Sequence, residues 1–393
     1  MGPCQPLVGS ARTYYVILMV VDVSQPVRVL VLGATGVFGS RLCERLLQLP
    51  SLNLTVASRS AEKAERLAAR LQTTAPDSTV IGRAVRIGKD LDQSLELLRP
   101  QIVVHAAGPF QGQNYGVAES SLAAGAHYID LADSTTFVTG FERLDKRARA
   151  AGRLAITGAS SVPGLSSTVV DSLAGQFQSL DMIDIGISPG NRAPRGHAVV
   201  EAILSYAGQP IPAWRNGGHA RAFGWQGLRR RSLRGLGPRW FCDCDVPDLL
   251  LFPRRYRANH VRFGAGLELS VLHLGLWGLA GLCRVGLLPN LRRFTALLRY
   301  AAVWFEGFGT DRGGMYVRVK GTDLNGQLVT RTWSLVAERG HGPFVPILPA
   351  TILVRKLANG SLARIGAMPC LGLFTLQDFR DEASDLKIAM TDG

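Results

Sequence analysis

The chain has 393 residues, of which 47% are hydrophobic and 19% charged, and its formal net charge is +14. The length predicts two or three domains of about 100–200 residues, and the composition excludes a disordered chain. The positive charge predicts attraction to anions such as phosphorylated cofactors, acidic substrates or anionic lipid. Nucleic acid is not expected, because no zinc-finger or RNA-recognition signature occurs.

The first 26 residues are expected to form an extension rather than a secretory signal. Their apolar run, 14–21, ends at Asp22 and leads into an ordinary strand start instead of a cleavage site. Six cysteines in so long a chain do not predict a disulfide framework, so we expect a reducing, cytoplasmic location. Cys242 and Cys244 lack a second pair nearby, and we therefore expect no metal site.

Strand-like and helix-like segments alternate from residue 27 to 165. Strands are predicted at 27–32, 53–57, 80–85, 101–106, 127–131 and 153–157, and helices at 41–49, 61–71, 91–98, 115–124 and 141–150. Such alternation with short connections is typical of a parallel sheet wrapped by helices. The predicted fold class is therefore α/β, with a doubly wound sheet of the Rossmann type.

The pattern changes after this domain. Residues 166–344 are expected to form an α+β substrate or dimerisation domain, with strands at 181–188 and a hairpin over 315–337 that turns at Asn325-Gly326. If the second domain serves dimerisation, the protein is expected to form a homodimer. The Arg-rich stretch 215–262 is compatible with a solvated loop or with a surface that faces anions. Residues 345–393, with a helix at 348–358, are expected to pack back on the first domain.

One apolar stretch, 265–283, bears on membrane contact. Its flanking residues Arg262 and Arg284 provide no charge asymmetry that would orient a membrane span. We favour a buried helix of the second domain, then a helix on a membrane surface, and least a true span. A peripheral membrane location is thus the alternative to a purely cytoplasmic one.

A glycine triplet, Gly33, Gly36 and Gly39, lies between the first strand and the first helix. In this context the glycines permit a sharp turn, close approach of a pyrophosphate, and tight packing of helix on strand. The helix N-terminus offers free N–H groups to phosphates. The predicted dinucleotide site therefore spans this turn, and Thr35, Val37 and Phe38 complete it.

The end of the second strand predicts which dinucleotide binds. No acidic residue is present there to hold a free ribose hydroxyl. Instead Ser58 and Arg59 end the strand, with Lys63 nearby, and a guanidinium suits a 2′-phosphate. NADP is therefore favoured over NAD.

The next cofactor contacts are predicted where the 101–106 strand ends. Ligands of doubly wound sheets bind outside the carboxyl ends of the strands. Ala107, Gly108, Pro109 and Phe110 occupy this position. We expect them to face the ribose and nicotinamide, with Phe110 as a wall.

Several motifs together resemble those of saccharopine dehydrogenase-like reductases. They are GATGVFG, ASR, AAGPFQGQNYGVAESSLAAGAHYIDLAD and GASSVPGLSS, with GHGPFVPILPATILVRKLANG near the end. The resemblance implies an NADP-dependent oxidoreductase that reduces an imine, ketone or enoyl small-molecule substrate, which could be anionic or lipid-like. It also implies that Gly108, Pro109, Phe110, Tyr128 and Asp130 line the active cleft.

Proton transfer has several candidate residues. Tyr128 and Asp130 face the same side of their strand, whereas His127 faces the other, so we predict the first two as catalytic. Tyr128 in the core and Asp130 as a helix cap are the structural alternatives. Arg195 and His197 could reach in from the second domain.

Two other functions remain open. One is a non-catalytic NADP-binding sensor or membrane-associated scaffold. The other is an atypical short-chain dehydrogenase, which needs Tyr-x-x-x-Lys on a helix. Only Tyr316 and Lys320 have this spacing, and they lie in the predicted hairpin.

Overall fold

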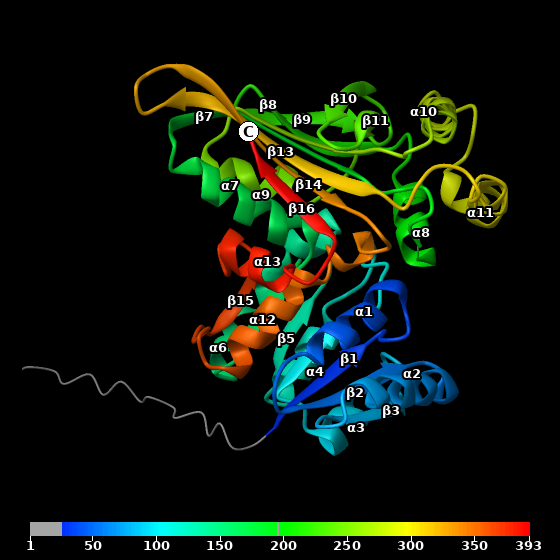
Figure 1. Cartoon of the computed structure of the whole chain (residues 1–393), viewed down its shortest axis with the longest axis vertical. Coiled ribbons are helices and arrows are strands. Elements are labelled where there is room, and N and C mark those ends of the chain that lie inside the picture. Colours follow the sequence, from blue (N-terminus) through cyan, green and yellow to red (C-terminus); the bar gives the residue numbers. More distant parts are fainter. Residues whose placement is uncertain (1–25, 195) are drawn as a thin grey trace, which may run out of the picture.

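The structure is a computed structural model that describes residues 26–194 and 196–393 (Figure 1). The predicted extension, 1–26, therefore lies outside the described residues except for Pro26. Two sheets with their helices are stacked along the long axis of the molecule (Figure 1).

The first sheet is parallel throughout and has seven strands in the order β15-β6-β5-β4-β1-β2-β3. The strands are β1 (Val27–Leu32), β2 (Leu52–Ser58), β3 (Thr79–Ala84), β4 (Ile102–His105), β5 (His127–Asp130), β6 (Leu154–Thr157) and β15 (Gly366–Pro369). The helices are α1 (Val37–Leu46), α2 (Ala61–Thr74), α3 (Leu91–Leu98), α4 (Gly116–Ala123), α5 (Thr135–Thr139) and α6 (Asp145–Ala150). Apolar side chains fill both faces of the sheet, and the Rossmann-type class is confirmed.

The second sheet has nine strands of mixed direction, and its main path runs β10-β11-β12-β7-β13-β14-β16. They are β7 (Phe177–Ser188), β8 (Pro210–Arg215), β9 (Gly218–Phe223), β10 (Arg229–Leu233), β11 (Gly237–Asp243), β12 (His260–Ala265), β13 (Gly313–Asp323), β14 (Leu328–Ala337) and β16 (Ile388–Asp392). The remaining helices are α7 (Ser166–Ala174), α8 (His197–Ser205), α9 (Asp248–Tyr256), α10 (Ser270–Arg284), α11 (Thr295–Val303), α12 (Leu348–Ala358) and α13 (Leu376–Glu382). Short helical turns occupy Phe141–Leu144, Ser161–Leu165, Leu291–Phe294 and Gly342–Phe344.

Several expectations need correction. The Arg-rich stretch is not a loop, because it forms β8 to β12 and α9. The first helix begins at Val37 rather than at residue 41, and α5 and β15 were not predicted. The hairpin of β13 and β14 is confirmed, with Gly326 at φ +81° in its turn.

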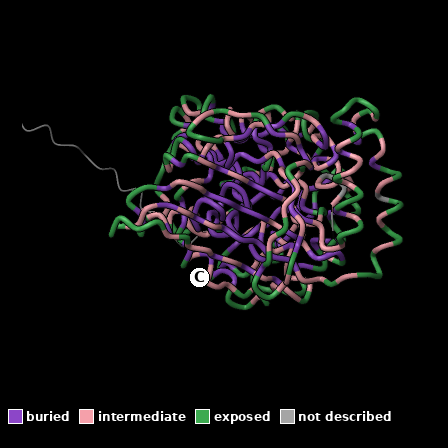
Figure 2. The backbone as a smooth tube through the Cα atoms, turned by 90° about the horizontal axis from the view of Figure 1, so that it is seen from above, coloured by how far each residue is buried: buried purple, intermediate pink, exposed green. Residues whose placement is uncertain are grey.

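The apolar stretch after β12 is not a buried helix. β12 ends at Ala265, and α10 buries only His273, Ala280 and Cys283. Figure 2 shows buried segments in the middle of the molecule and mostly exposed or intermediate ones at its edge. Within the described residues, no helix is long and apolar enough to cross a membrane.

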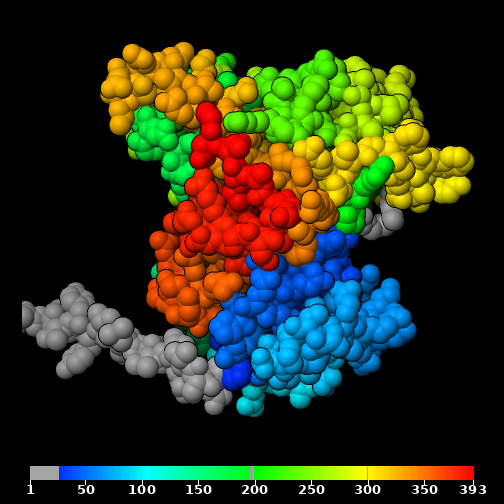
Figure 3. Space-filling view, in the orientation of Figure 1, coloured from blue at the N-terminus to red at the C-terminus, as the bar shows by residue number. Residues whose placement is uncertain are grey.

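The C-terminal segment joins the two sheets. β15 pairs with β6 of the first sheet, whereas β16 pairs with β14 of the second. Arg45 of α1 donates to Glu382 and Asp385, and both partners belong to this segment. Figure 3 shows these residues, in orange and red, lying across the contact between the two halves. The segment therefore packs on both sheets, not on the first alone.

Candidate functional site

The turn between β1 and α1 is a tight elbow. Gly33 has φ +76°, in the left-handed region that favours glycine, and a Cβ there would lie 2.8 Å from Ala107. A Cβ on Gly39 would lie 2.8 Å from the Cα of Ala34, so glycine allows α1 to pack closely on the end of β1. The elbow thus meets the segment that follows β4.

The first turn of α1 is open to an anion. Gly36 is its N-cap, no side chain caps the helix, and the first turn contains no acidic residue. The N–H groups of Val37, Phe38 and Gly39 therefore have no partner within the helix, and Thr35 is exposed at the tip. This end suits a diphosphate, and a cofactor role for these residues stays a prediction.

Basic side chains gather where β2 and β3 end. Arg59 is exposed directly after β2 and has no ion pair among the described residues, and Lys63 is exposed in the first turn of α2. The Ser58 hydroxyl is already engaged, because it donates to the Ser60 carbonyl at 3.0 Å. Arg83 on the neighbouring strand β3 adds a cation that sequence reasoning missed. The position of Arg83 near the end of the predicted strand 80–85 could have indicated a residue close to the ligand-binding edge.

The corner that follows β4, residues 107–110, is stabilised by hydrogen bonds from a side chain further along the chain. The Gln113 amide donates to the carbonyl oxygens of Ala107 and Pro109 at 2.9 and 2.7 Å. Gly108 is exposed, but Phe110 is only 4% exposed and packs against two other aromatic rings. Phe110 therefore lies largely out of reach of a ligand here, and its role as a wall of the nicotinamide site stays a prediction. Its ring lies beneath the corner and supports it.

Tyr128 and Asp130 lie in the core, since both are 0% exposed. The Tyr128 hydroxyl lies 3.0 Å from Nδ1 of His105. Burial raises the pKa of Tyr128 well above its ordinary value, and the charge of Asp130 adds to this shift. Burial lowers the pKa of His105 to about 4, so its ring is neutral. Sequence reasoning missed His105, although it ends a strand at the ligand-binding edge.

Asp130 connects two strand ends. Its Oδ1 accepts hydrogen bonds from the Ala132 and Gly158 N–H groups at 2.9 and 2.8 Å and from the Thr157 hydroxyl at 2.9 Å. Burial nevertheless raises its pKa to about 6. Asp130 therefore holds β5 against β6 and does not cap a helix. Catalysis by Asp130 or Tyr128 stays a prediction, and neither lies in an open cleft.

The other candidate bases are placed differently. His127 begins β5, so it lies at the edge of the sheet opposite the cofactor loops, where its Nδ1 accepts from the Leu154 N–H at 3.0 Å. Burial and the charge of Arg153 lower its pKa to about 4. Arg195 lies outside the described residues, and so does the side chain of His197.

A cavity of about 230 Å³ lies between the second sheet and α1. Phe38 and Ser161 line it from the first half, next to the elbow and to the loop after β6. From the second half come mainly apolar and glycine residues of β7, α8, β13 and the 342–346 segment. Only Ser161, Trp225 and Asp311 among its lining residues carry a polar side-chain N or O. Sequence reasoning missed this cavity, because its lining comes from distant segments.

The Cys242 thiol is not a reactive site. It lies 3.3 Å from Nε2 of His273, whose Nδ1 accepts from the Leu267 N–H at 3.2 Å. Burial lowers the pKa of His273 to about 4 and raises the pKa of Cys242, so both groups are neutral. Among the described residues, no group of three or more His, Cys, Asp and Glu side chains could hold a metal ion.

Comparison with known proteins supports an NADP-binding domain in the first half of the chain. Residues 29–156 match the family model of the saccharopine dehydrogenase NADP binding domain. No significantly similar sequence is found among the curated proteins.

A similar solved structure is apo saccharopine dehydrogenase (L-Glu forming) from Saccharomyces cerevisiae. It has a TM-score of 0.67 and 14% identity, and the match covers 94% of this chain and 100% of that one. Amine dehydrogenase from Mycobacterium smegmatis matches with a TM-score of 0.47 and 11% identity over 88% of this chain and 95% of that one.

The residues present fit a bound NADP. Glycine is required by the positive φ of Gly33 and the close packing at Gly39, the N-terminus of α1 is uncapped, and Arg59 is unpaired among described residues. The domain match covers these features. The chain therefore contains, over residues 29–156, a domain that matches the saccharopine dehydrogenase NADP binding domain family.

Proposed function

We propose that the protein catalyses hydride transfer between NADP(H) and an imine, ketone or enoyl carbon of an apolar substrate. The observation that carries this proposal is the cavity of about 230 Å³, which shares Phe38 and Ser161 with the cofactor side. Bound NADP(H) would supply or accept the hydride. The substrate's apolar part would fill the cavity and exclude water from the reacting carbon.

In this proposal the chain's own residues bind and orient the reactants. The first turn of α1 and Arg59 hold the phosphates, and the backbone around Gly108 faces the nicotinamide ribose. The Ser161 hydroxyl and the Trp225 N–H as donors, or the Asp311 carboxylate as an acceptor, would position the substrate's polar group, because no other lining side chain carries N or O. Tyr128 and Asp130 remain the predicted proton-transfer pair.

The experiment is a series of ketones, imines and enoyl compounds of increasing alkyl length, with NADPH oxidation followed by absorbance. We expect kcat/KM to rise about threefold to fourfold per methylene until the cavity is full, because each buried CH₂ contributes about 0.8 kcal/mol. Ile203 of α8 lines the cavity and is half-buried. Ile203→Asp should flatten the dependence on chain length while NADPH binding is retained.

Leu97→Asp, at a side chain 77% exposed on α3, is the matched control and should leave the series unchanged. NADPH binding without turnover of any compound would favour the non-catalytic sensor. The short-chain dehydrogenase alternative is disfavoured, because Tyr316 and Lys320 both lie on β13 and the Tyr316 hydroxyl donates to Asp184 at 3.3 Å.

We also propose that the α10–α11 region rests on an anionic membrane surface. Its exposed large apolar side chains are Val271, Leu274, Trp277, Leu282, Val285, Leu287, Leu297, Tyr300, Val303, Trp304 and Phe308. Such a patch is unusual on a protein surface, and the net charge of +14 complements anionic lipid. The cavity's α8 wall packs against this region. An apolar substrate could therefore reach the cavity from the membrane side.

A further inference from the structure

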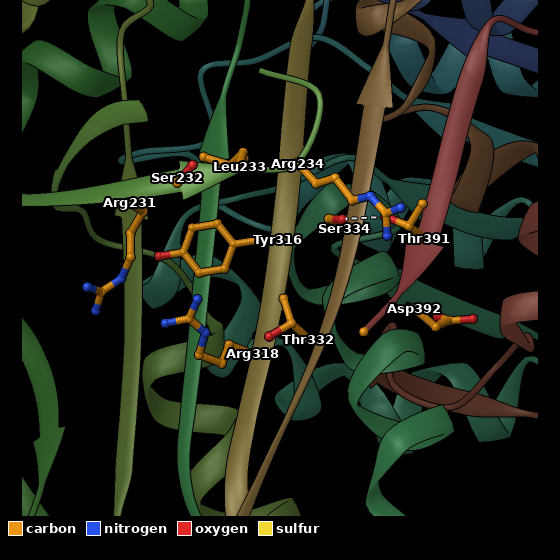
Figure 4. Close-up of a pocket in the computed structure, with 11 residues that line it drawn as sticks. Arg231, Ser232, Leu233, Arg234, Tyr316, Arg318, Thr332, Ser334, Thr391 and Asp392 are labelled. Carbon is orange, nitrogen blue, oxygen red and sulfur yellow. Dashed lines mark hydrogen bonds between the residues drawn. The ribbon is translucent and has the colours of Figure 1, made fainter. Parts of the chain in front are cut away.

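A second pocket lies on the other face of the second sheet. On β13 and β14, Val317 and Trp333 point into the core, whereas Tyr316, Arg318 and Ser334 point to the opposite face. The β10 arm and the turn after it lie over this face, and they enclose a pocket of about 160 Å³ (Figure 4). We call it the arginine pocket, and it is defined by Arg231, Arg234, Arg318, Thr332, Ser334 and Thr391.

The side-chain charges of the arginine pocket are not balanced, although Gly393 also lines it and accepts from the Thr332 N–H at 2.6 Å. Arg231 pairs with the buried Asp184 at 3.3 Å. Asp392 also lines the pocket, but it pairs with Arg380 at 3.0 Å. Within the described part of the chain, Arg234 and Arg318 have no acidic partner. Removing these two positive charges would therefore leave no acid without its partner.

Buried donors in the pocket also lack acceptors. The Nε atoms of Arg231 and Arg318 are buried and have no hydrogen-bond partner among the described residues. Such groups are costly unless something accepts from them. At the other end, the Ser334 and Thr391 hydroxyls share one hydrogen bond of 2.7 Å. One of the two O–H groups is therefore free to donate elsewhere. Figure 4 shows the Arg234 side chain extending towards this pair.

We propose that the arginine pocket binds a phosphate monoester. Guanidinium groups form paired hydrogen bonds with phosphate oxygens, and a phosphate monoester has three such oxygens where a carboxylate has two. The pocket is too small for a drug-sized ligand, but it suits a phosphate group. The ester could belong to a soluble metabolite or to a lipid headgroup. This site is separate from the proposed cofactor and substrate sites, and it does not depend on the proposed reaction.

The test is binding with the cofactor site saturated by NADPH. Glycerol 3-phosphate, titrated by calorimetry, is the soluble probe. Phosphatidylcholine vesicles that contain phosphatidic acid, used in co-sedimentation, are the lipid probe. We expect Arg318→Gln and Arg234→Gln each to weaken binding by roughly tenfold or more. Arg234 is exposed, so its variant should fold even if Arg318→Gln does not.

Lys320→Gln is the matched control, because it removes one positive charge from the same strand and face outside the pocket. A loss restricted to the arginine variants supports the site. If the arginine variants lose binding of glycerol 3-phosphate, the ligand is a soluble metabolite. If they lose only binding to the vesicles, the ligand is a lipid headgroup. Binding of neither probe, or an equal loss in Lys320→Gln, would overturn the proposal.

Discussion

The two sheets present their candidate ligand surfaces in different ways. At the edge of the first sheet, the surface offered to a ligand is mostly backbone, at Gly36 and Gly108 and in the first turn of α1. On the second sheet it is made of side chains, apolar in the cavity on one face and basic in the arginine pocket on the other. The difference teaches that the first surface needs particular glycines, whereas the second needs only side chains of suitable character from many segments.

The largest effect should come from blocking the backbone surface. In Gly39→Ala the new Cβ would lie 2.8 Å from the Cα of Ala34, which is backbone and cannot move aside. We expect NADPH affinity to fall by about a hundredfold or more, because α1 would be pushed away from β1. Fluorescence titration with NADPH measures this loss.

Gly175→Ala is the control for that experiment. Gly175 ends α7 with φ −62°, and a Cβ there would meet nothing within 4 Å. It should bind NADPH as the unmodified protein does. Normal affinity in Gly39→Ala would refute the idea that the first surface depends on close backbone packing.

The next effect concerns Arg59, the side chain predicted to hold the 2′-phosphate. Arg59→Gln should lower the preference for NADPH over NADH by about tenfold to a hundredfold, because a charge-assisted contact with the 2′-phosphate is lost. Arg66→Gln is matched to it, since Arg66 is exposed on α2 and pairs with Glu62 at 3.2 Å. The measurement is the affinity of each variant and of the unmodified protein for NADPH and for NADH. If Arg66→Gln changes the preference as much as Arg59→Gln, then general charge and not a 2′-phosphate contact is responsible.

A smaller effect is expected at the apolar helices of the second half. Trp304 is 72% exposed, so Trp304→Ser removes apolar surface without opening the core. Binding to anionic vesicles should weaken by about fivefold, since interfacial binding scales with buried apolar area. Co-sedimentation measures it, with Leu97→Ser on α3 as the control. Equal binding by both variants and the unmodified protein would argue against membrane contact through α10–α11.

The last effect does not involve a ligand and is on stability as a function of pH. Asp248 is buried where α9 meets α7 and accepts a hydrogen bond from Ser166. Burial raises its pKa from 3.8 to about 7. Because the folded state holds this proton more tightly than the unfolded state, Asp248 stabilises the fold below about pH 4. That contribution is lost as the pH rises through 7.

Urea unfolding between pH 4 and 7 tests this. The free energy of unfolding of the unmodified protein should fall, relative to Asp248→Asn, by on the order of 3 kcal/mol. Asp381→Asn, at an exposed position, should follow the unmodified protein. Parallel pH profiles for the unmodified protein and Asp248→Asn would show that Asp248 is not buried as described.

The first half was largely predictable because its signals are local. The β1 strand, the α3 helix and the glycine elbow each depend on residues close together in the chain, and the structure has β1 and α3 at their predicted bounds. The burial of Phe110 could not be predicted, because strand-end position does not say which way a side chain turns. His105 was missed because its importance comes from its contact with Tyr128 on another strand.

The sequence by itself determined the Rossmann-type sheet and the NADP-binding elbow, because hydrophobic periodicity and glycine spacing act through short-range sterics and hydrogen bonding. Only the tertiary structure decided that β15 completes the first sheet and that the Arg-rich stretch is strand. It also decided that Phe38 and Leu335 line one cavity, and Arg234 and Thr391 another. The physical reason is that these surfaces arise where distant segments pack together, and no periodicity along the chain encodes which segments will meet.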